Sequence, residues 1–144
     1  MPVTVSSLTC RACDQISPEE RLTVYQKLLA YNLAHLEHKA PQDLGIFLED
    51  ARKNMIGALL GVTHGNWLKV DYLWVETAFR GKKLGSQLLK RAETTAVLRG
   101  CKQVFLDTFD FQAPHFYEKM GYKQAFVLNE YPLTGKRYYY TKML

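Results

Sequence analysis

Hydrophobic residues recur with two different periods along the chain, and each period predicts one kind of element. In the first third, five apolar residues stand three or four positions apart: Leu22, Tyr25, Leu29, Leu33 and Leu36. This spacing places them on one face of a helix. The segment Ser17–Glu20 supplies the serine, proline and glutamates of a capped helix start. We therefore expect one long helix, or two short ones, from Pro18 to about His38.

Runs of β-branched and aromatic residues between polar turns predict the strands. Seven strands are expected: Val3–Val5, Leu44–Glu49, Met55–Thr63, Trp67–Val75, Gln103–Phe109, Tyr122–Val127 and Lys136–Thr141. The turns at Glu49–Asn54 and His64–Asn66 are short, so the second, third and fourth strands should form an antiparallel meander. Two more helices are expected, one from Leu84 to Gly100 and one over Pro114–Met120. The succession β-α-β-β-β-α-β-α-β-β predicts a mixed α/β fold.

Composition narrows the class of protein without identifying it. A chain of 144 residues is expected to form a single domain, 1–144, and its 47% hydrophobic and 23% charged residues are typical of soluble globular proteins. The net charge of +5 suits an anionic ligand. Three cysteines favour a reducing compartment over a disulfide framework. Neither a signal peptide nor a transmembrane run is visible, so we expect a cytoplasmic protein without a membrane partner.

The segment Arg80–Ser86 combines features of a phosphate-binding loop. It runs into a predicted helix, whose first turn presents free backbone N–H groups and the positive end of the helix dipole. Gly81 and Gly85 allow a ligand to approach the backbone closely. Three cations add positive charge: Arg80, Lys82 and Lys83. The patterns of a P-loop and of a dinucleotide fingerprint are both missing. The loop taken alone is equally consistent with an ordinary basic surface turn.

Two motifs in the second half of the chain resemble the Gcn5-related N-acetyltransferase (GNAT) superfamily. The family signature [RQ]-x-x-G-x-[GA] corresponds to Arg80–Gly85 (RGKKLG), and the family mark F-Y-E-K-x-G-[FY] is complete at Phe116–Tyr122. The resemblance covers about residues 44–144, and the tail is similar to a group of small bacterial acetyltransferases of unassigned substrate. It implies a mixed central sheet of six to seven strands with flanking helices, splayed between the fourth and fifth strands.

The sequence departs from the family pattern at two positions. The first glycine of the signature is Lys83 here, whose Cβ restricts the loop while its ammonium adds a phosphate contact. The asparagine often found before the second motif is Asp110. Ala113, in contrast, matches the small residue that the family often has there.

The resemblance implies acetyl-coenzyme A (acetyl-CoA) as the acetyl donor. By position, the backbone of residues 80–86 would hold its pyrophosphate, and the backbone of Trp74 and Val75 would bond its pantetheine arm. Splayed strands leave backbone groups unpaired, and an amide-rich arm satisfies them. The residues expected at the cofactor are Trp74, Val75, Arg80, Gly81, Lys82, Lys83, Leu84, Gly85, Ser86, Ala113, Phe116 and Tyr117.

The same resemblance assigns Tyr117 to the acid that often protonates the leaving thiolate, with a core tyrosine as the alternative. Asp71 is the first candidate for the base, because a carboxylate inside an apolar strand needs a reason. It could also anchor a cationic amine or serve as a buried hydrogen-bond partner. Alternation puts Asp71 on one face with Lys69, Leu73 and Val75.

Glu76, at the strand end, is the second candidate for the base, with a solvated charge as its alternative. His115 faces either the acceptor or solvent. Tyr138–Tyr140 suits strand packing, substrate lining or a homodimer interface, and pairing through the last strands is usual for the family.

Two other functions are not favoured. The pairs Cys10/Cys13 and His35/His38 are separated by 21 residues, which does not fit a zinc finger, so no metal site is expected. Lysines and arginines are spread over the chain rather than gathered on one element, so no nucleic-acid partner is expected.

The sequence therefore predicts an N-acetyltransferase that moves an acetyl group from acetyl-CoA to a primary amine by direct attack. A small-molecule acceptor is preferred because no substrate module is added to the domain. The alternatives are a non-catalytic CoA-binding or regulatory domain and a protein acetyltransferase acting on lysines or N-termini.

Overall fold

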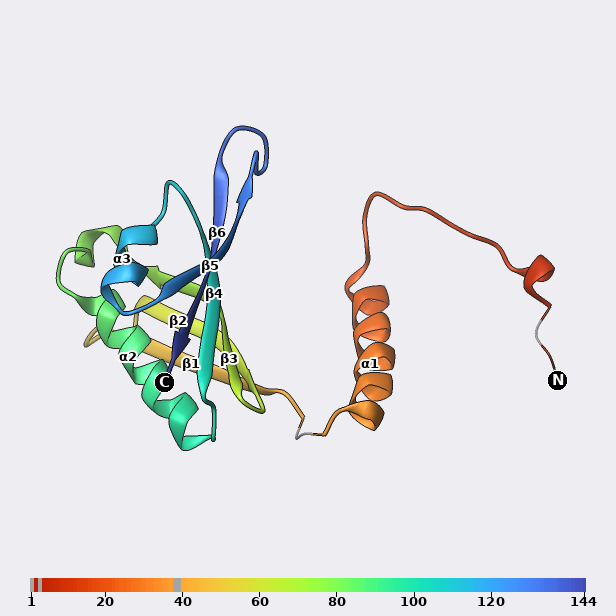
Figure 1. Cartoon of the computed structure of the whole chain (residues 1–144), viewed down its shortest axis with the longest axis horizontal. Helices are drawn as coiled ribbons and strands as arrows, with labels where there is room; N and C mark the ends of the chain where they lie inside the picture. The colour runs from red at the N-terminus through yellow and green to blue at the C-terminus, as the bar shows by residue number, and fades with distance from the viewer. Residues whose placement is uncertain (1, 3, 38–39) are drawn as a thin grey trace. The chain divides into compact units, whose positions relative to one another are not determined.

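The chain divides into two compact units, Met1–Glu37 and His38–Leu144, in a computed structural model that describes residues 2, 4–37 and 40–144. Figure 1 shows the elements of both units. The expectation of a single domain therefore stays a prediction. Within the described residues, no helix combines the length and apolar character needed to cross a membrane.

Among its described residues, the first unit contains one α-helix, α1 (Pro18–His35). Its capping box forms as the sequence predicts: Ser17 Oγ accepts the Glu20 N–H at 3.0 Å, and Glu20 Oε1 accepts the Ser17 N–H at 3.4 Å. The helix ends before the expected His38, which lies outside the described residues.

The strand expected at Val3–Val5 is wrong, because Val5–Ser7 is a 3-10 turn. Ser7 closes that turn by donating both its N–H and its hydroxyl to the Thr4 carbonyl, at 3.1 and 2.7 Å. Val3 lies outside the described residues.

The second unit is built on one six-stranded sheet with the order β1-β2-β3-β4-β6-β5. The strands are β1 (Gln42–Glu49), β2 (Met55–His64), β3 (Trp67–Val75), β4 (Gln103–Phe109), β5 (Lys123–Asn129) and β6 (Lys136–Met143). Neighbouring strands are antiparallel, except that β3 and β4 are parallel. The predicted mixed sheet and the three-strand meander are confirmed.

Two helices, α2 (Leu84–Leu98) and α3 (Pro114–Lys119), contribute to one core with the sheet. Figure 1 shows α2 along one face of the sheet. Leu88 and Leu89 of α2 are at most 1% exposed, and Tyr117 of α3 belongs to the same cluster. Each such leucine stabilises the fold by about 1.5–3 kcal/mol. The opposite face of the sheet carries the alternate residues of each strand.

Strands β3 and β4 are paired only at one end. Their register runs from Trp67 opposite Gln103 to Lys69 opposite Phe105 and stops there. Strand β4 remains paired with β6 along its whole length, to Phe109. Figure 1 shows β4 running steeply across the direction of β1–β3. The predicted splay is confirmed, and it opens between the remaining residues of β3 and β4.

A bulge in β3 changes which side chains share a face. Leu60 of β2 lies opposite Tyr72, but the next residue, Gly61, lies opposite Val70, so Asp71 is one extra residue in β3. A Cβ on Gly61 would lie 2.5 Å from the Lys69 carbonyl oxygen, so only glycine permits this close approach.

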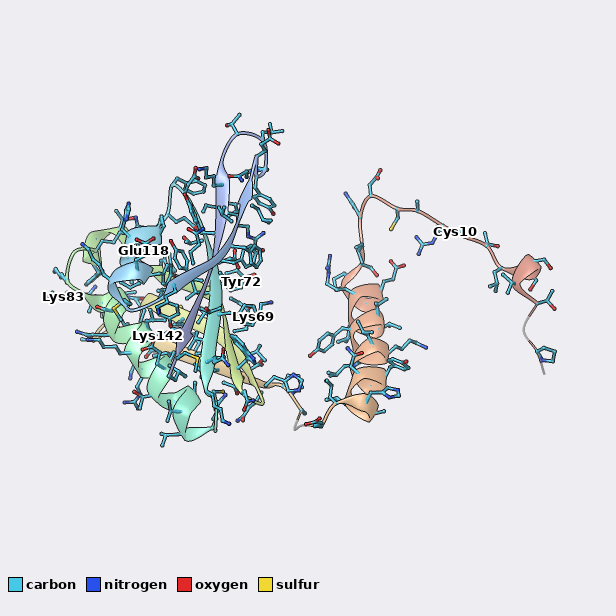
Figure 2. The ribbon with its side chains drawn as sticks, in the orientation of Figure 1. Cys10, Lys69, Tyr72, Lys83, Glu118 and Lys142 are labelled. Carbon is cyan, nitrogen blue, oxygen red and sulfur yellow. The ribbon has the colours of Figure 1, made fainter. Side chains whose placement is uncertain are left out.

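The predicted face of Asp71 is therefore wrong in part. Lys69 does lie beside it, with Nζ 3.4 Å from Oδ1. Leu73 and Val75, however, pack against the core, because the bulge resets the alternation. Figure 2 shows Lys69 and Tyr72 on the side of the sheet away from α2.

Candidate functional site

The loop between β3 and α2 turns sharply in front of the helix. Gly81 has φ +79°, and Lys83, the residue just before α2, has φ +60°. The Lys83 side chain makes no capping hydrogen bond, so it does not satisfy the N–H groups of the first helical turn. A Cβ on Gly81 would meet no atom within 4 Å, so the loop faces open space there. The segment is thus free to receive an anion.

The three cations of the loop have different surroundings. Arg80 folds back, with Nε donating to the Val75 carbonyl oxygen at 3.1 Å. Lys82 Nζ lies 5.7 Å from the centre of the Phe79 ring. Lys83 is exposed and projects beside the start of α2 (Figure 2). Two ammonium groups therefore remain available for a phosphate.

Helix α3 lies against this loop. The edge of the Phe116 ring is 3.7 Å from the position that a Cβ on Gly85 would take. Ala113 precedes α3, and its N–H donates to Thr108 Oγ1 of β4 at 3.4 Å. The two predicted motifs, distant in sequence, therefore meet at the N-terminus of α2.

The open edge of β3 exposes backbone groups, but not those of both predicted residues. Glu76 N–H donates to the Ile56 carbonyl at 2.8 Å, and Val75 lies opposite Gly57. Because antiparallel pairs alternate between bonded and non-bonded, the backbone of Trp74 points toward β2. The backbone groups of Leu73 and Val75 point the other way, into the splay. Leu73 thus has the orientation predicted for Trp74.

The Tyr117 side chain is buried, but its hydroxyl remains accessible to solvent. Its side chain is surrounded by the rings of Phe116, Tyr122 and Tyr140, with centroids 5.1–6.2 Å away. Burial, and then the Asp107 charge, raise the pKa of Tyr117 to about 12. Within the described residues, the Tyr117 hydroxyl has no hydrogen-bond partner. Every fully buried side-chain oxygen there does have a partner, so this hydroxyl contacts solvent. It is a protonated phenol with a free O–H.

The candidate bases occupy the open edge of β3. Asp71 sits at the bulge with 30% of its side chain exposed, and Glu76 is exposed just after the strand. His115 is exposed at the start of α3, with Nδ1 3.6 Å from Glu118 Oε2. Asp71 and Glu76 both lie beyond Lys69, the last β3 residue that pairs with β4, whereas the His115 side chain is 90% exposed.

Sequence reasoning missed an ion pair on β4 and β6. Arg137 Nε donates to Asp107 Oδ2 at 2.7 Å, and Arg137 Nη1 donates to the Tyr131 hydroxyl at 2.9 Å. Asp107 alternates along β4 with the buried Leu106 and Thr108. That alternation was the available signal, since it places a carboxylate on the face away from α2.

A second missed network is buried on the α2 side. Lys142 Nζ lies 3.1 Å from both carboxylate oxygens of Glu93, and the Tyr122 hydroxyl donates to Glu93 Oε2 at 2.7 Å. Burial and the Glu93 carboxylate together raise the pKa of Tyr122. The network ties α2 to β6 and to the end of the α3 motif.

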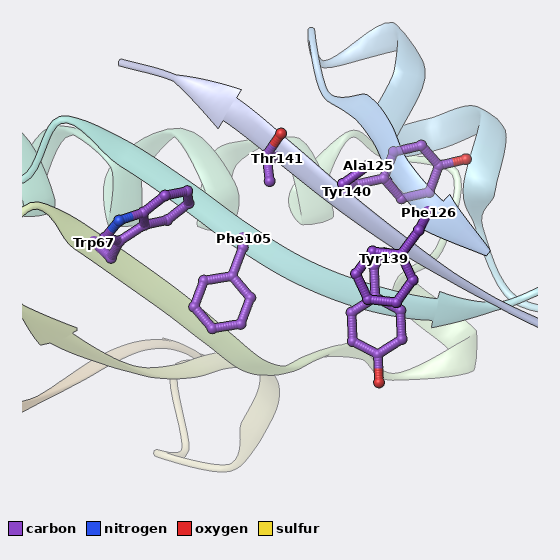
Figure 3. A pocket seen from close by; sticks show the side chains of 7 residues that line it. All are labelled: Trp67, Phe105, Ala125, Phe126, Tyr139, Tyr140 and Thr141. Atoms are coloured by element: carbon purple, nitrogen blue, oxygen red, sulfur yellow. The ribbon is translucent and has the colours of Figure 1, made fainter. Parts of the chain in front are cut away.

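An apolar groove of about 300 Å³ lies on the other side of the sheet (Figure 3). Its walls include two aromatic pairs, Trp67 with Phe105 and Phe126 with Tyr139. It runs beside the paired ends of β3 and β4, and none of its lining residues belongs to the loop between β3 and α2.

The described residues contain no group of three or more His, Cys, Asp or Glu placed to hold a metal ion. Cys10 and Cys13 are exposed.

Comparison with known proteins gives consistent matches. Residues 10–122 match the model of the acetyltransferase (GNAT) family. The chain is 44% identical over 82 residues to blasticidin-S acetyltransferase of Streptomyces morookaense, which covers 56% of this chain and 60% of that protein. It is 34% identical over 109 residues to acetyltransferase Atu2258 of Agrobacterium fabrum, covering 76% of this chain and 80% of the relative.

A solved structure of a putative acetyltransferase from Agrobacterium tumefaciens is similar along nearly the whole chain. The TM-score is 0.88 at 29% identity, over 95% of this chain and 100% of that one.

Proposed function

Because the chain belongs to the acetyltransferase (GNAT) family, we propose that it transfers an acetyl group from acetyl-CoA to a primary amine of a small molecule. Members of this family use acetyl-CoA as the donor. The observation that carries the proposal is the splay between β3 and β4, which leaves an edge of β3 unpaired next to the open loop that begins α2. The Tyr117 hydroxyl, which has no hydrogen-bond partner among the described residues, supports it.

The loop would hold the pyrophosphate of acetyl-CoA. The first-turn N–H groups of α2, from Leu84 to Ser86, supply donors, and Lys82 and Lys83 supply charge. Ala113 and Phe116 border the same space through their contacts with Thr108 and the Gly85 region.

The pantetheine arm would lie along the open edge of β3. We assign its backbone partners to Leu73 and Val75 rather than to Trp74 and Val75, because the backbone of Trp74 points toward β2. The Val75 carbonyl already accepts a hydrogen bond from Arg80, so the N–H is the backbone group of Val75 that is left for the arm.

The transfer needs one base and one acid. A free amine would form when a carboxylate removes its proton, and we assign this step to Asp71 or Glu76, which both lie beyond the last β3 residue that pairs with β4. The amine would then attack the thioester carbonyl, so that the C–N bond forms and the C–S bond breaks, and the nitrogen would release its extra proton to solvent to give the neutral amide. Tyr117 donates its proton to the departing thiolate and recovers one from solvent. A pKa of about 12 keeps this phenol protonated at neutral pH.

A small-molecule acceptor is supported by the relative named blasticidin-S acetyltransferase. The matched part spans 60% of that protein, so its own acceptor is not transferred to this chain. A cytoplasmic location and a homodimer formed through the last strands remain predictions. A non-catalytic CoA-binding domain would not need the Tyr117 phenol to be left without a hydrogen-bond partner among the described residues.

The proposal is tested by mixing the full chain with acetyl-CoA and a panel of primary amines and measuring release of the CoA thiol. Mass spectrometry of the acceptor identifies the acetylated product. We expect amine-dependent release by the wild-type protein and strong loss in Tyr117→Phe. Binding of acetyl-CoA without transfer to any amine would instead support the non-catalytic alternative.

A further inference from the structure

Asp107 and Arg137 lie at the point where β3 leaves the sheet. Phe105 is the last residue of β4 that pairs with β3, and Asp107 is two positions further along, on the same face. In the β4–β6 ladder, Asp107 lies opposite Tyr139 and Phe109 lies opposite Arg137. The pair therefore borders the mouth of the splay, on the side away from α2.

The guanidinium of Arg137 is held from several directions. Its central carbon lies 5.2–5.6 Å from the ring centroids of Phe109, Tyr131 and Tyr139. Its Nε and Nη1 are bonded to Asp107 and Tyr131. A side chain fixed in this way loses little further entropy when it binds a ligand, which is the condition for a preorganised site.

Asp107 and Arg137 each have one polar atom that is available to a ligand. Within the described residues, neither Asp107 Oδ1 nor Arg137 Nη2 has a hydrogen-bond partner. The Asp107 side chain is 26% exposed and that of Arg137 is 27% exposed. Every fully buried side-chain N or O atom of the described residues has a partner, so these two unpartnered atoms contact solvent. The pair thus offers a carboxylate oxygen and a cationic N–H side by side.

We propose that Asp107 and Arg137 form the binding subsite for an amino-acid-like acceptor, with the ammonium on Asp107 and the carboxylate on Arg137. This inference rests on the proposed acetyltransferase function. The ion pair has no net charge, so a ligand of one sign would leave a charge unbalanced, whereas a zwitterion is matched at both ends.

The subsite also puts the amine where the chemistry is proposed to occur. The Asp107 charge acts on the Tyr117 phenol strongly enough to contribute to its raised pKa. Geometry places the subsite as well: Asp107 lies two residues beyond the last β4 residue that pairs with β3, so an amine held on its carboxylate would lie at the mouth of the splay. It still has to lose a proton to Asp71, Glu76 or water before it attacks.

The experiment compares matched acceptors on matched variants. The common L-amino acids, their amides and their decarboxylated amines are each supplied with acetyl-CoA to the full chain, and kcat and KM are measured from thiol release. The variants are Arg137→Gln, Asp107→Asn and Arg137→Lys, which keeps the charge but loses the second donor. Lys136→Gln is the control, because it removes an exposed cation next to Arg137 on the same strand.

The wild-type protein should prefer at least one amino acid over its amide by about 10- to 100-fold in kcat/KM, through KM. Arg137→Gln and Arg137→Lys should remove that preference while acetylation of the amide changes less than about twofold. Asp107→Asn should weaken acid and amide alike, and Lys136→Gln should behave as wild type.

The inference is overturned if no amino acid is acetylated, if the amides or decarboxylated amines are the better acceptors, or if Arg137→Gln affects acid and amide equally. If amines that lack a carboxylate are still acetylated in these cases, the proposed acetyltransferase function is supported even though the subsite is rejected. Loss of both acetyl-CoA binding and all transfer would reject the two proposals together.

Discussion

Arg80 Nε donates a hydrogen bond to the carbonyl oxygen of Val75 over 3.1 Å. The loop in front of α2 is thereby tied to the end of β3, the two elements proposed to hold the two halves of the cofactor. The arginine of the family signature therefore has a structural role in this chain, in positioning the loop. We propose that it would act on the cofactor through the backbone that it holds.

Removing this contact should weaken cofactor binding more than turnover. For Arg80→Ala we expect the Kd of acetyl-CoA to rise about tenfold, the equivalent of one lost charge-assisted hydrogen bond, with kcat changed less than about twofold. Calorimetric titration and steady-state kinetics measure the two values. Arg91→Ala is the matched control, because it removes an exposed arginine further along α2. Equal affinity in the two variants would contradict the role given to Arg80.

Tyr117→Phe should separate chemistry from folding. We expect kcat to fall by about 100-fold, as for loss of a general acid, while the Kd of acetyl-CoA and the unfolding free energy stay close to wild type. Stability is preserved because the hydroxyl makes no hydrogen bond among the described residues. Tyr122→Phe is the comparison: it removes the bond to Glu93 and should cost about 1–3 kcal/mol of stability. Wild-type turnover by Tyr117→Phe would refute the acid assignment.

The raised pKa of Tyr117 also predicts how stability depends on pH. The unfolded chain loses this proton near pH 10, whereas the folded protein keeps it to about pH 12. The unfolded state therefore binds fewer protons in that range, and the unfolding free energy falls as pH rises from 10 to 12, by about 3 kcal/mol for this group. Urea titrations across this range should show a smaller decline for Tyr117→Phe. Identical slopes for both proteins would show that the phenol is not perturbed.

Lys83 should make the folded protein less stable than glycine would at the same position. Its φ of +60° lies in the left-handed region, so Lys83→Gly should raise the unfolding free energy by about 1 kcal/mol. Lys83→Ala removes the same charge but keeps the Cβ, so it should gain nothing in stability. If the ammonium contacts phosphate, both variants lose the same severalfold affinity for acetyl-CoA. A stability gain shared by both variants would assign the effect to charge instead of backbone.

The buried pair Glu93–Lys142 should be sensitive to losing one partner. Lys142→Met leaves the Glu93 carboxylate buried without its cation, which should cost about 3–5 kcal/mol. The double variant Glu93→Leu with Lys142→Met should recover most of that loss. Denaturant titration of the single and double variants checks this. Additive losses would mean that the two side chains are not coupled.

The sequence predicted most elements of the second unit because their signals are local. Turn glycines, the proline that begins α3 and the apolar spacing of α2 each depend on neighbouring residues. The expected strand at Val3–Val5 failed because three residues carry little periodicity, and the Ser7 hydroxyl can close a turn there instead.

The parts of the candidate site that carry a sequence motif could be predicted. The loop and α3 were located by pattern, and the structure brings Gly85 and Phe116 together. The face of Asp71 was not predictable, because a bulge made possible by Gly61 shifts the alternation without any change in composition. The Asp107–Arg137 pair joins residues 30 positions apart, which a periodicity cannot connect.

The central claim, that the splay and its loop bind acetyl-CoA, is tested most directly by isothermal titration of the full chain with acetyl-CoA, with NAD and ATP as controls. The account predicts micromolar binding of acetyl-CoA at one site per chain, weakened in Arg80→Ala and unchanged in Arg91→Ala, and no comparable binding of NAD or ATP. Absence of acetyl-CoA binding, or equal binding of all three nucleotides, would contradict it.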